Sequence, residues 1–196
     1  GYGYLQGASA AAKELGVDVT VNYSWQYGDS FGASPELQSM IAGWYTTGTE
    51  VVFSCGGNMF ASVSAAASSS AASDNDGLVV GVDVDQSSAS DTVITSAMKS
   101  LADGVVIALE DHFNGSWDEV GGTTITLGAT EDAVGLPTAT ESWRFENFTV
   151  EEYNTLFEAI KDGTLTVDAE YPVNENNIDD AASLNGELPN ITINVV

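Results

Sequence analysis

The stretch Leu78-Val-Val-Gly-Val-Asp-Val-Asp-Gln86 decides the fold of this chain. Its first half is a continuous apolar run, which is typical of a parallel strand covered by helices on both faces. Asp83 and Asp85 follow at the carboxyl end, where open α/β sheets bind small ligands. Lys99 comes shortly afterwards, and it is one of only four basic residues in the chain. The stretch therefore predicts a buried strand that ends in a site for a polar ligand.

Helix and strand patterns alternate on both sides of this strand. The expected helices cover residues 5–15, 35–46, 58–73, 97–113 and 149–163, and the expected strands cover 17–25, 50–55, 78–84, 92–96, 123–128 and 190–195. Strands separated by helices favour right-handed crossovers and a parallel sheet, so the fold class is α/β. The Asn- and Asp-rich stretch 172–187 is typical of a surface loop.

Three consecutive strands of the expected sheet end in residues suited to a ligand. We expect Trp25, the Gly56–Gly57 pair and the two aspartates to line one crevice. The glycines let a ligand approach the backbone, and the helix that follows them offers free N–H donors. The loop 26–32 should lie over the same edge, where Phe31 can stack on a planar base.

Each of these residues also has a structural interpretation. The aspartates can cap the loop that follows their strand, and Phe31 and Trp25 can serve in packing. Lys99 is expected in the first turn of a helix, where a cation is electrostatically unfavourable. Its position there suggests a reason such as a neighbouring Asp83.

Composition limits the classes of partner. A chain of 196 residues with 43% hydrophobic residues can bury the core of one or one and a half domains. Its formal net charge of −25 argues against nucleic acid and anionic membrane surfaces, because binding phosphate requires lysine and arginine. A neutral or cationic ligand is easier to accommodate. No apolar stretch is long enough to span a membrane.

Five blocks of sequence, taken together and in order, strongly resemble the basic membrane protein family, the substrate-binding lipoproteins of ABC transporters that include purine nucleoside receptors. The blocks are Gly3-Tyr-Leu-Gln-Gly-Ala8, Val52-Phe-Ser-Cys-Gly-Gly57, Gly81-Val-Asp-Val-Asp-Gln-Ser87, Val93-Ile-Thr-Ser-Ala-Met-Lys99 and Gly128-Ala-Thr-Glu-Asp-Ala-Val-Gly-Leu-Pro137. The resemblance implies the type I periplasmic-binding fold, in which a hinge joins two α/β lobes.

The resemblance also implies a division of the chain and of the site. Residues 1–96 would form the second-lobe core, and residues 97–196 the crossover helix, the hinge strands and a segment that returns to the first lobe, which is largely absent. Asp83 and Lys99 would hold the ribose hydroxyls of a purine nucleoside, and Phe31 would stack on the base. The intact protein would be lipid-anchored on the outer side of a bacterial membrane, through an N-terminal anchor absent from this chain, and would deliver its ligand to ABC transporter permease subunits.

Two other functions remain open from the residues alone. A sugar or autoinducer receptor on the same fold would use the same acids and aromatics. In a metal-dependent nucleoside-processing enzyme, Asp83 and Asp85 would hold a divalent cation. The sequence has no phosphate-binding loop and no cluster of histidines and cysteines. We therefore expect a binding protein without catalytic residues, metal or cofactor.

Overall fold

The computed structural model describes residues 1–70, 77–170 and 182–196. It divides into two compact units: unit 1 comprises residues 1–31 and 166–196, and unit 2 comprises residues 32–165. The expected lobe boundary between residues 96 and 97 falls inside unit 2 and remains a prediction.

Unit 1 packs one helix against a short parallel sheet. Helix α1 (Tyr2–Leu15) ends at Gly16, whose left-handed φ of 68° matches the glycine C-cap expected from the sequence. Strand β1 (Val19–Tyr23) pairs in parallel with β6 (Ile191–Val195). The core of the unit consists of Leu5, Leu184, Ile191 and Ile193.

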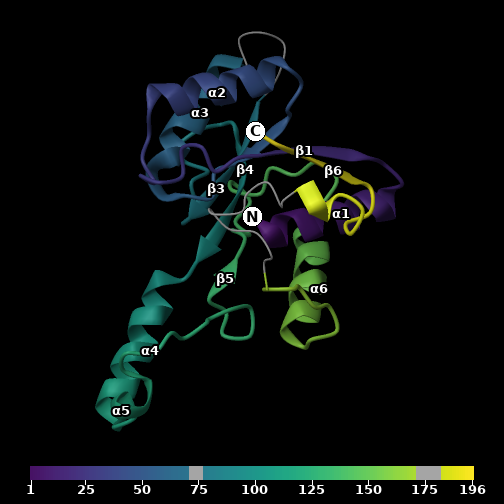
Figure 1. Ribbon diagram of the computed structural model, residues 1–196. Helices are drawn as coiled ribbons and strands as arrows, with labels where there is room; N and C mark the ends of the chain where they lie inside the picture. The colour runs from purple at the N-terminus through teal and green to yellow at the C-terminus, as the bar shows by residue number, and fades with distance from the viewer. Residues whose placement is uncertain (71–76, 171–181) are drawn as a thin grey trace. The chain divides into compact units, whose positions relative to one another are not determined.

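Unit 2 is built on a four-stranded sheet with the order β2-β3-β4-β5. Figure 1 labels β3, β4 and β5 of this sheet. Strands β2 (Val51–Phe53), β3 (Leu78–Asp83) and β4 (Val93–Lys99) are parallel. The short β5 (Val134–Gly135) runs antiparallel to β4. Val79 and Val80 of β3 are buried, which confirms that the apolar run before Asp83 is an interior strand.

Two helices lie side by side against this sheet (Figure 1). Helix α2 (Pro35–Thr46) begins at its expected N-cap, because the side chain of Ser34 accepts a hydrogen bond from the Leu37 N–H. A turn of 3-10 helix, η1 (Gly57–Met59), leads into α3 (Phe60–Ser70). The fully buried Tyr45 of α2 donates its hydroxyl to the Leu78 carbonyl at 2.8 Å. Burial raises the pKa of Tyr45, so the hydroxyl remains a donor and joins α2 to β3.

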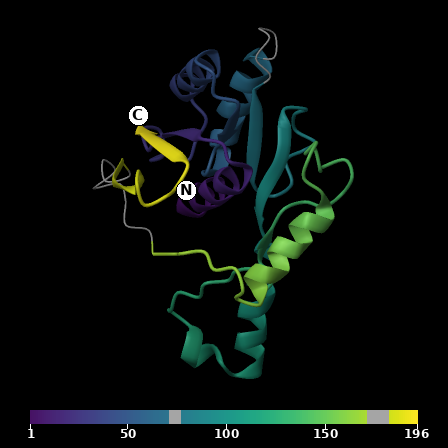
Figure 2. The ribbon, with the colours of Figure 1, turned by 90° about the vertical axis from the view of Figure 1, so that its right-hand side faces the viewer.

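The remaining helices follow the sheet in sequence. Helix α4 (Leu101–Asn114) and the short α5 (Trp117–Val120) extend away from the sheet of unit 2 in both views (Figures 1 and 2). Helix α6 (Val150–Lys161) starts with the capping box expected at Thr149 and Glu152. No helix within residues 1–70, 77–170 and 182–196 combines the length and apolarity needed to cross a membrane.

Three expectations about the elements were wrong. Residues 97–99 belong to β4 and not to a helix, because Met98 and Lys99 pair with β5 and Ser100 then caps α4. Residues 123–128 do not form a strand. Strand β1 pairs with β6 and not within the sheet of β2 and β3, so the three strand ends do not belong to one sheet. Residues 71–73 of one expected helix and most of the expected loop 172–187 lie outside the described residues.

Candidate ligand site

The clearest candidate site lies at the carboxyl ends of β3 and β4. Asp83 is the last residue of β3 and is paired in register with Met98, the neighbour of Lys99 on β4. Lys99 Nζ lies 3.0 Å from Asp83 Oδ1. The two side chains are 58% and 35% exposed, so both charges can reach a ligand in solvent. The expected pairing of these two residues is therefore present, although Lys99 reaches it from a strand.

The backbone at Asp83 adopts an uncommon conformation. Its φ is 68°, and the Val84 N–H donates to the Val82 carbonyl at 2.8 Å across it. This is the pattern of a γ-turn with positive φ, which is rare and strained. A non-glycine residue keeps such a conformation only where its surroundings enforce it, and such residues cluster at functional sites. The turn sets the direction of a carboxylate that already faces Lys99.

The side chain of Gln86 holds the turn from behind. Its Oε1 accepts from the Val82 N–H at 2.8 Å, and the backbone N–H of Gln86 donates to Ser96 Oγ at 3.0 Å. Gly81 makes room for this arrangement: a Cβ there would lie 2.5 Å from Ser96 Oγ and 2.8 Å from Gln86 Oε1. The glycine of the Gly-Val-Asp motif is thus required by packing.

Asp85 is bonded within the chain. Its Oδ1 accepts from the Ser87 N–H at 3.0 Å and its Oδ2 from Ser142 Oγ at 2.5 Å. Desolvation acts to raise the pKa of Asp85, but these hydrogen bonds and the charge of Arg144 outweigh it and lower the pKa. The carboxylate therefore stays ionised and joins its loop to a distant segment. Neither Ser142 nor Arg144 stood out in the sequence, although Arg144 is the only arginine.

The end of β2 supplies mainly backbone to the same edge of the sheet. The Gly56 N–H donates to the Ser54 carbonyl at 2.8 Å in a tight turn, and Gly57 opens η1 with a φ of 40°. Gly56 is buried, whereas Gly57 and the free Cys55 are exposed. Ser54 is 5% exposed, and its hydroxyl has no hydrogen-bond partner within the described residues. Buried polar atoms are normally satisfied, so Ser54 is a candidate that sequence reasoning missed.

The two aromatic candidates belong to unit 1. Phe31 is 59% exposed and has a φ of 50°, a second strained non-glycine conformation. Its N–H donates to the Gly28 carbonyl at 3.2 Å, which closes the turn that presents the ring. Trp25 is half-buried and meets Tyr23 edge to face at 6.1 Å between ring centroids. An exposed aromatic ring on a strained turn suits stacking on a ligand, and Trp25 is the more packed of the two.

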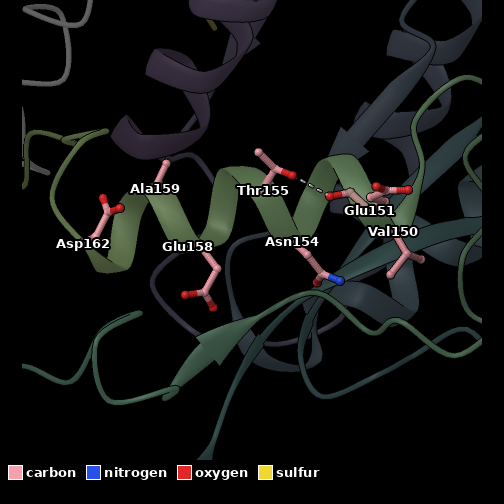
Figure 3. A pocket seen from close by; sticks show the side chains of 7 residues that line it. All are labelled: Val150, Glu151, Asn154, Thr155, Glu158, Ala159 and Asp162. Carbon is pink, nitrogen blue, oxygen red and sulfur yellow. Dashed lines mark hydrogen bonds between the residues drawn. The ribbon is translucent and has the colours of Figure 1, made fainter.

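Another concave surface contains none of these residues. It is an open groove on one face of α6 (Figure 3), and its lining is Val150, Glu151, Asn154, Thr155, Glu158, Ala159 and Asp162. All of these residues belong to α6 except Asp162, which is the C-cap of the helix. Within the described parts of the chain, no three histidine, cysteine, aspartate or glutamate residues are grouped so as to hold a metal ion.

The comparisons with known proteins agree with the fold. A family model described as "ABC transporter substrate-binding protein PnrA-like" (Bmp) matches residues 1–177. A crystal structure of ABC transporter system solute-binding proteins from Aeropyrum pernix K1 is similar, with a TM-score of 0.68 at 20% sequence identity. The match covers 94% of this chain but 56% of that one, so the chain spans little more than half of its structural relative. No curated protein matches.

Proposed function

The chain belongs to the Bmp family of PnrA-like ABC transporter substrate-binding proteins, and we propose that its full-length protein binds a purine nucleoside for import. The family consists of binding proteins and not of enzymes, in agreement with the expectation from the sequence. Delivery to permease subunits, a position outside the cytoplasm and a lipid anchor on the membrane are parts of this proposal.

The main observation in support of a nucleoside ligand is the pair of Asp83 and Lys99, in which Asp83 Oδ1 and Lys99 Nζ lie 3.0 Å apart. A carboxylate accepts hydrogen bonds only, and an ammonium group donates them only. Each hydroxyl of a vicinal diol can donate to one and accept from the other. The pair therefore suits the 2′ and 3′ hydroxyls of ribose, and the strained turn at Asp83 fixes the direction in which the acid meets them.

The other candidates complete the proposal. Phe31 stacks on the base, with Trp25 as a further aromatic contact. Gly56 and Gly57 allow close approach of the ligand to the backbone. Beside them lies the buried Ser54 hydroxyl, which has no hydrogen-bond partner in the described parts of the chain. We assign Asp85 an indirect part, because both of its oxygens are already bonded within the chain.

Charge distinguishes a nucleoside from a nucleotide. The net charge of −25 repels anions at a distance, and a phosphate near Asp83 would find Lys99 as its cation on these two strands. We therefore expect inosine, adenosine and guanosine to bind more tightly than their monophosphates.

A thermal-shift screen of the full-length protein tests this function. The ligands are the three nucleosides, their free bases, their monophosphates and a set of sugars, each at the same concentration. The proposal requires the largest stabilisation from a nucleoside, because a ligand that binds only the folded state raises Tm. Stabilisation by a sugar and by no nucleoside would contradict it and would establish the sugar-receptor alternative.

A further inference from the structure

Arg144 binds two backbone carbonyls of the connection between β3 and β4 and the carbonyl of the first residue of β4. Its Nη1 donates to the carbonyls of Ser90 at 2.9 Å and Val93 at 2.8 Å, and its Nη2 donates to the Ser87 carbonyl at 3.0 Å. The backbone N–H of Arg144 also donates to the Ile94 carbonyl at 3.3 Å. A guanidinium group offers donors in a fixed planar fork, whereas a lysine offers all of its donors from one atom. Arg144 thus braces the whole connection from Ser87 to the start of β4.

Ser142, two residues earlier, binds the first part of the same connection. It is 1% exposed, and its hydroxyl donates to Asp85 Oδ2 while accepting from the Ser87 hydroxyl at 3.0 Å. Asp85 in turn accepts from the Ser87 N–H. Ser142 and Arg144 together form what we call the clamp.

The clamp is itself anchored by aromatic residues. Between its two members lies Trp143, whose Nε1 donates to the Phe148 carbonyl at 2.7 Å. The Trp143 ring meets those of Phe145 at 5.0 Å, Phe148 at 5.6 Å and Tyr153 of α6 at 5.7 Å between centroids. The Tyr153 hydroxyl accepts from the Leu136 N–H at 2.9 Å, which ties the cluster to the end of β5. A segment fixed in this way provides a rigid support for the β3–β4 connection.

We propose that Ser142 and Arg144 are positioning residues for the Asp83 carboxylate, which binds the ligand in the proposed function. The strained γ-turn at Asp83 opens directly into the connection that they hold, and such strain persists only while its surroundings enforce it. When the clamp is removed, residues 84–92 shift, Asp83 returns to an ordinary negative φ and its carboxylate turns away from Lys99. The inference deepens the proposed function and rests on it for the identity of the ligand.

The clamp is tested without any ligand by amide hydrogen exchange in the full-length protein. The variants are Ser142→Ala and Arg144→Lys. Lys161→Ala is the matched control, because Lys161 is about as buried as Arg144 (26% against 30% exposed) and pairs with Asp132 instead. Exchange at the Val84 amide should accelerate on the order of tenfold in both clamp variants, because opening of the turn becomes easier. The exchange rate of the Ile41 amide in α2 should not change in the clamp variants. In the control Lys161→Ala, the exchange rate of the Val84 amide should equal that of the wild type.

Inosine affinity provides the second readout. Each clamp variant should weaken inosine binding on the order of tenfold, because a smaller fraction of molecules holds Asp83 in the competent conformation. In an Asp83→Ala background the same substitutions should cause no further loss, since they act through Asp83. A merely structural role would weaken binding equally in both backgrounds.

The outcomes separate the two claims. Unchanged exchange at Val84, or equal losses of affinity with and without Asp83, would overturn the clamp proposal. If the wild-type protein binds none of inosine, adenosine and guanosine, the proposed function is wrong, and the exchange data alone still decide whether the clamp holds the turn. If it binds adenosine or guanosine instead of inosine, that nucleoside replaces inosine in the affinity measurements. Ser142→Ala removes a single hydroxyl and is the milder of the two changes. If Arg144→Lys fails to fold, Ser142→Ala still tests the clamp proposal.

Discussion

Replacing Asp83 by asparagine should separate ligand binding from folding. Asparagine has nearly the same shape and tolerates positive φ, so the γ-turn at φ 68° can persist. The ion pair with Lys99 joins side chains that are 35% and 58% exposed, and exposed pairs of this kind contribute about 0–1 kcal/mol to stability. We therefore expect Asp83→Asn to shift Tm by at most a few degrees.

The effect on affinity should be much larger. Hydrogen bonds to charged groups contribute about 1.5–3 kcal/mol, and 1.4 kcal/mol corresponds to tenfold in Kd. Asp83→Asn and Lys99→Met should each weaken inosine binding about tenfold to a hundredfold. The double variant should lose less affinity than the sum of the two single losses, because both residues are proposed to contact the same diol.

Isothermal titration calorimetry with inosine, run beside thermal melts of the free protein, measures both quantities. Lys161→Met is the control, because it breaks an ion pair of 2.8 Å with Asp132 that takes no part in the proposed site. Its affinity should equal that of the wild type. Asp83→Asn with wild-type affinity, or with a loss of affinity matched by a large loss of stability, would refute the reasoning.

Three further predictions concern other parts of the site. Phe31→Ala should weaken nucleoside binding by roughly 1–3 kcal/mol in a titration while leaving the Tm of the free protein nearly unchanged, because the ring is 59% exposed and is proposed to stack on the base. Phe31→Trp should retain much of the affinity. A loss of Tm without a loss of affinity would show that the ring only packs. Gly81→Ala should lower Tm and weaken binding together, because its Cβ would come within 2.8 Å of Gln86 Oε1, and unchanged amide NMR shifts around Gln86 would contradict this. The lowered pKa of Asp85 means that its stabilising effect is present at neutral pH and is lost as pH falls below 3.8 toward the folded-state pKa. Asp85→Asn should therefore flatten the acid side of a stability-against-pH curve recorded by urea unfolding, and an unchanged slope would be the contrary result.

The pairing of Asp83 with Lys99 could be predicted from the sequence, but the secondary structure that holds Lys99 could not. The local pattern of an apolar run that ends in aspartates is enough to indicate a buried strand and a ligand-binding site at the carboxyl end of that strand. The end of β4 depends instead on pairing with β5, which lies far along the chain and is only two residues long. Patterns that need such a partner are not visible in the local sequence, so residues 97–99 looked helical.

The clamp shows the same limit for the site. Ser142 and Asp85 are 57 positions apart, and the sequence around either residue does not predict their hydrogen bond. The sequence offered one signal for Arg144: it is the single arginine in a chain with 29 acidic residues, so many carboxylates could pair with it. Arg144 instead binds three carbonyls and lies 3.9 Å from Asp91, a result of tertiary packing that residue types alone do not specify.

The proposal that Asp83 and Lys99 hold a ribose diol is tested most directly by comparing inosine with 2′,3′-dideoxyinosine in calorimetric titrations of the full-length protein. The two ligands share the base and differ only in the hydroxyls that this pair would bind. Loss of both hydroxyls leaves the charged groups without their partners, so the dideoxy compound should bind on the order of a hundredfold more weakly or worse. Equal affinity for the two compounds would contradict the proposal.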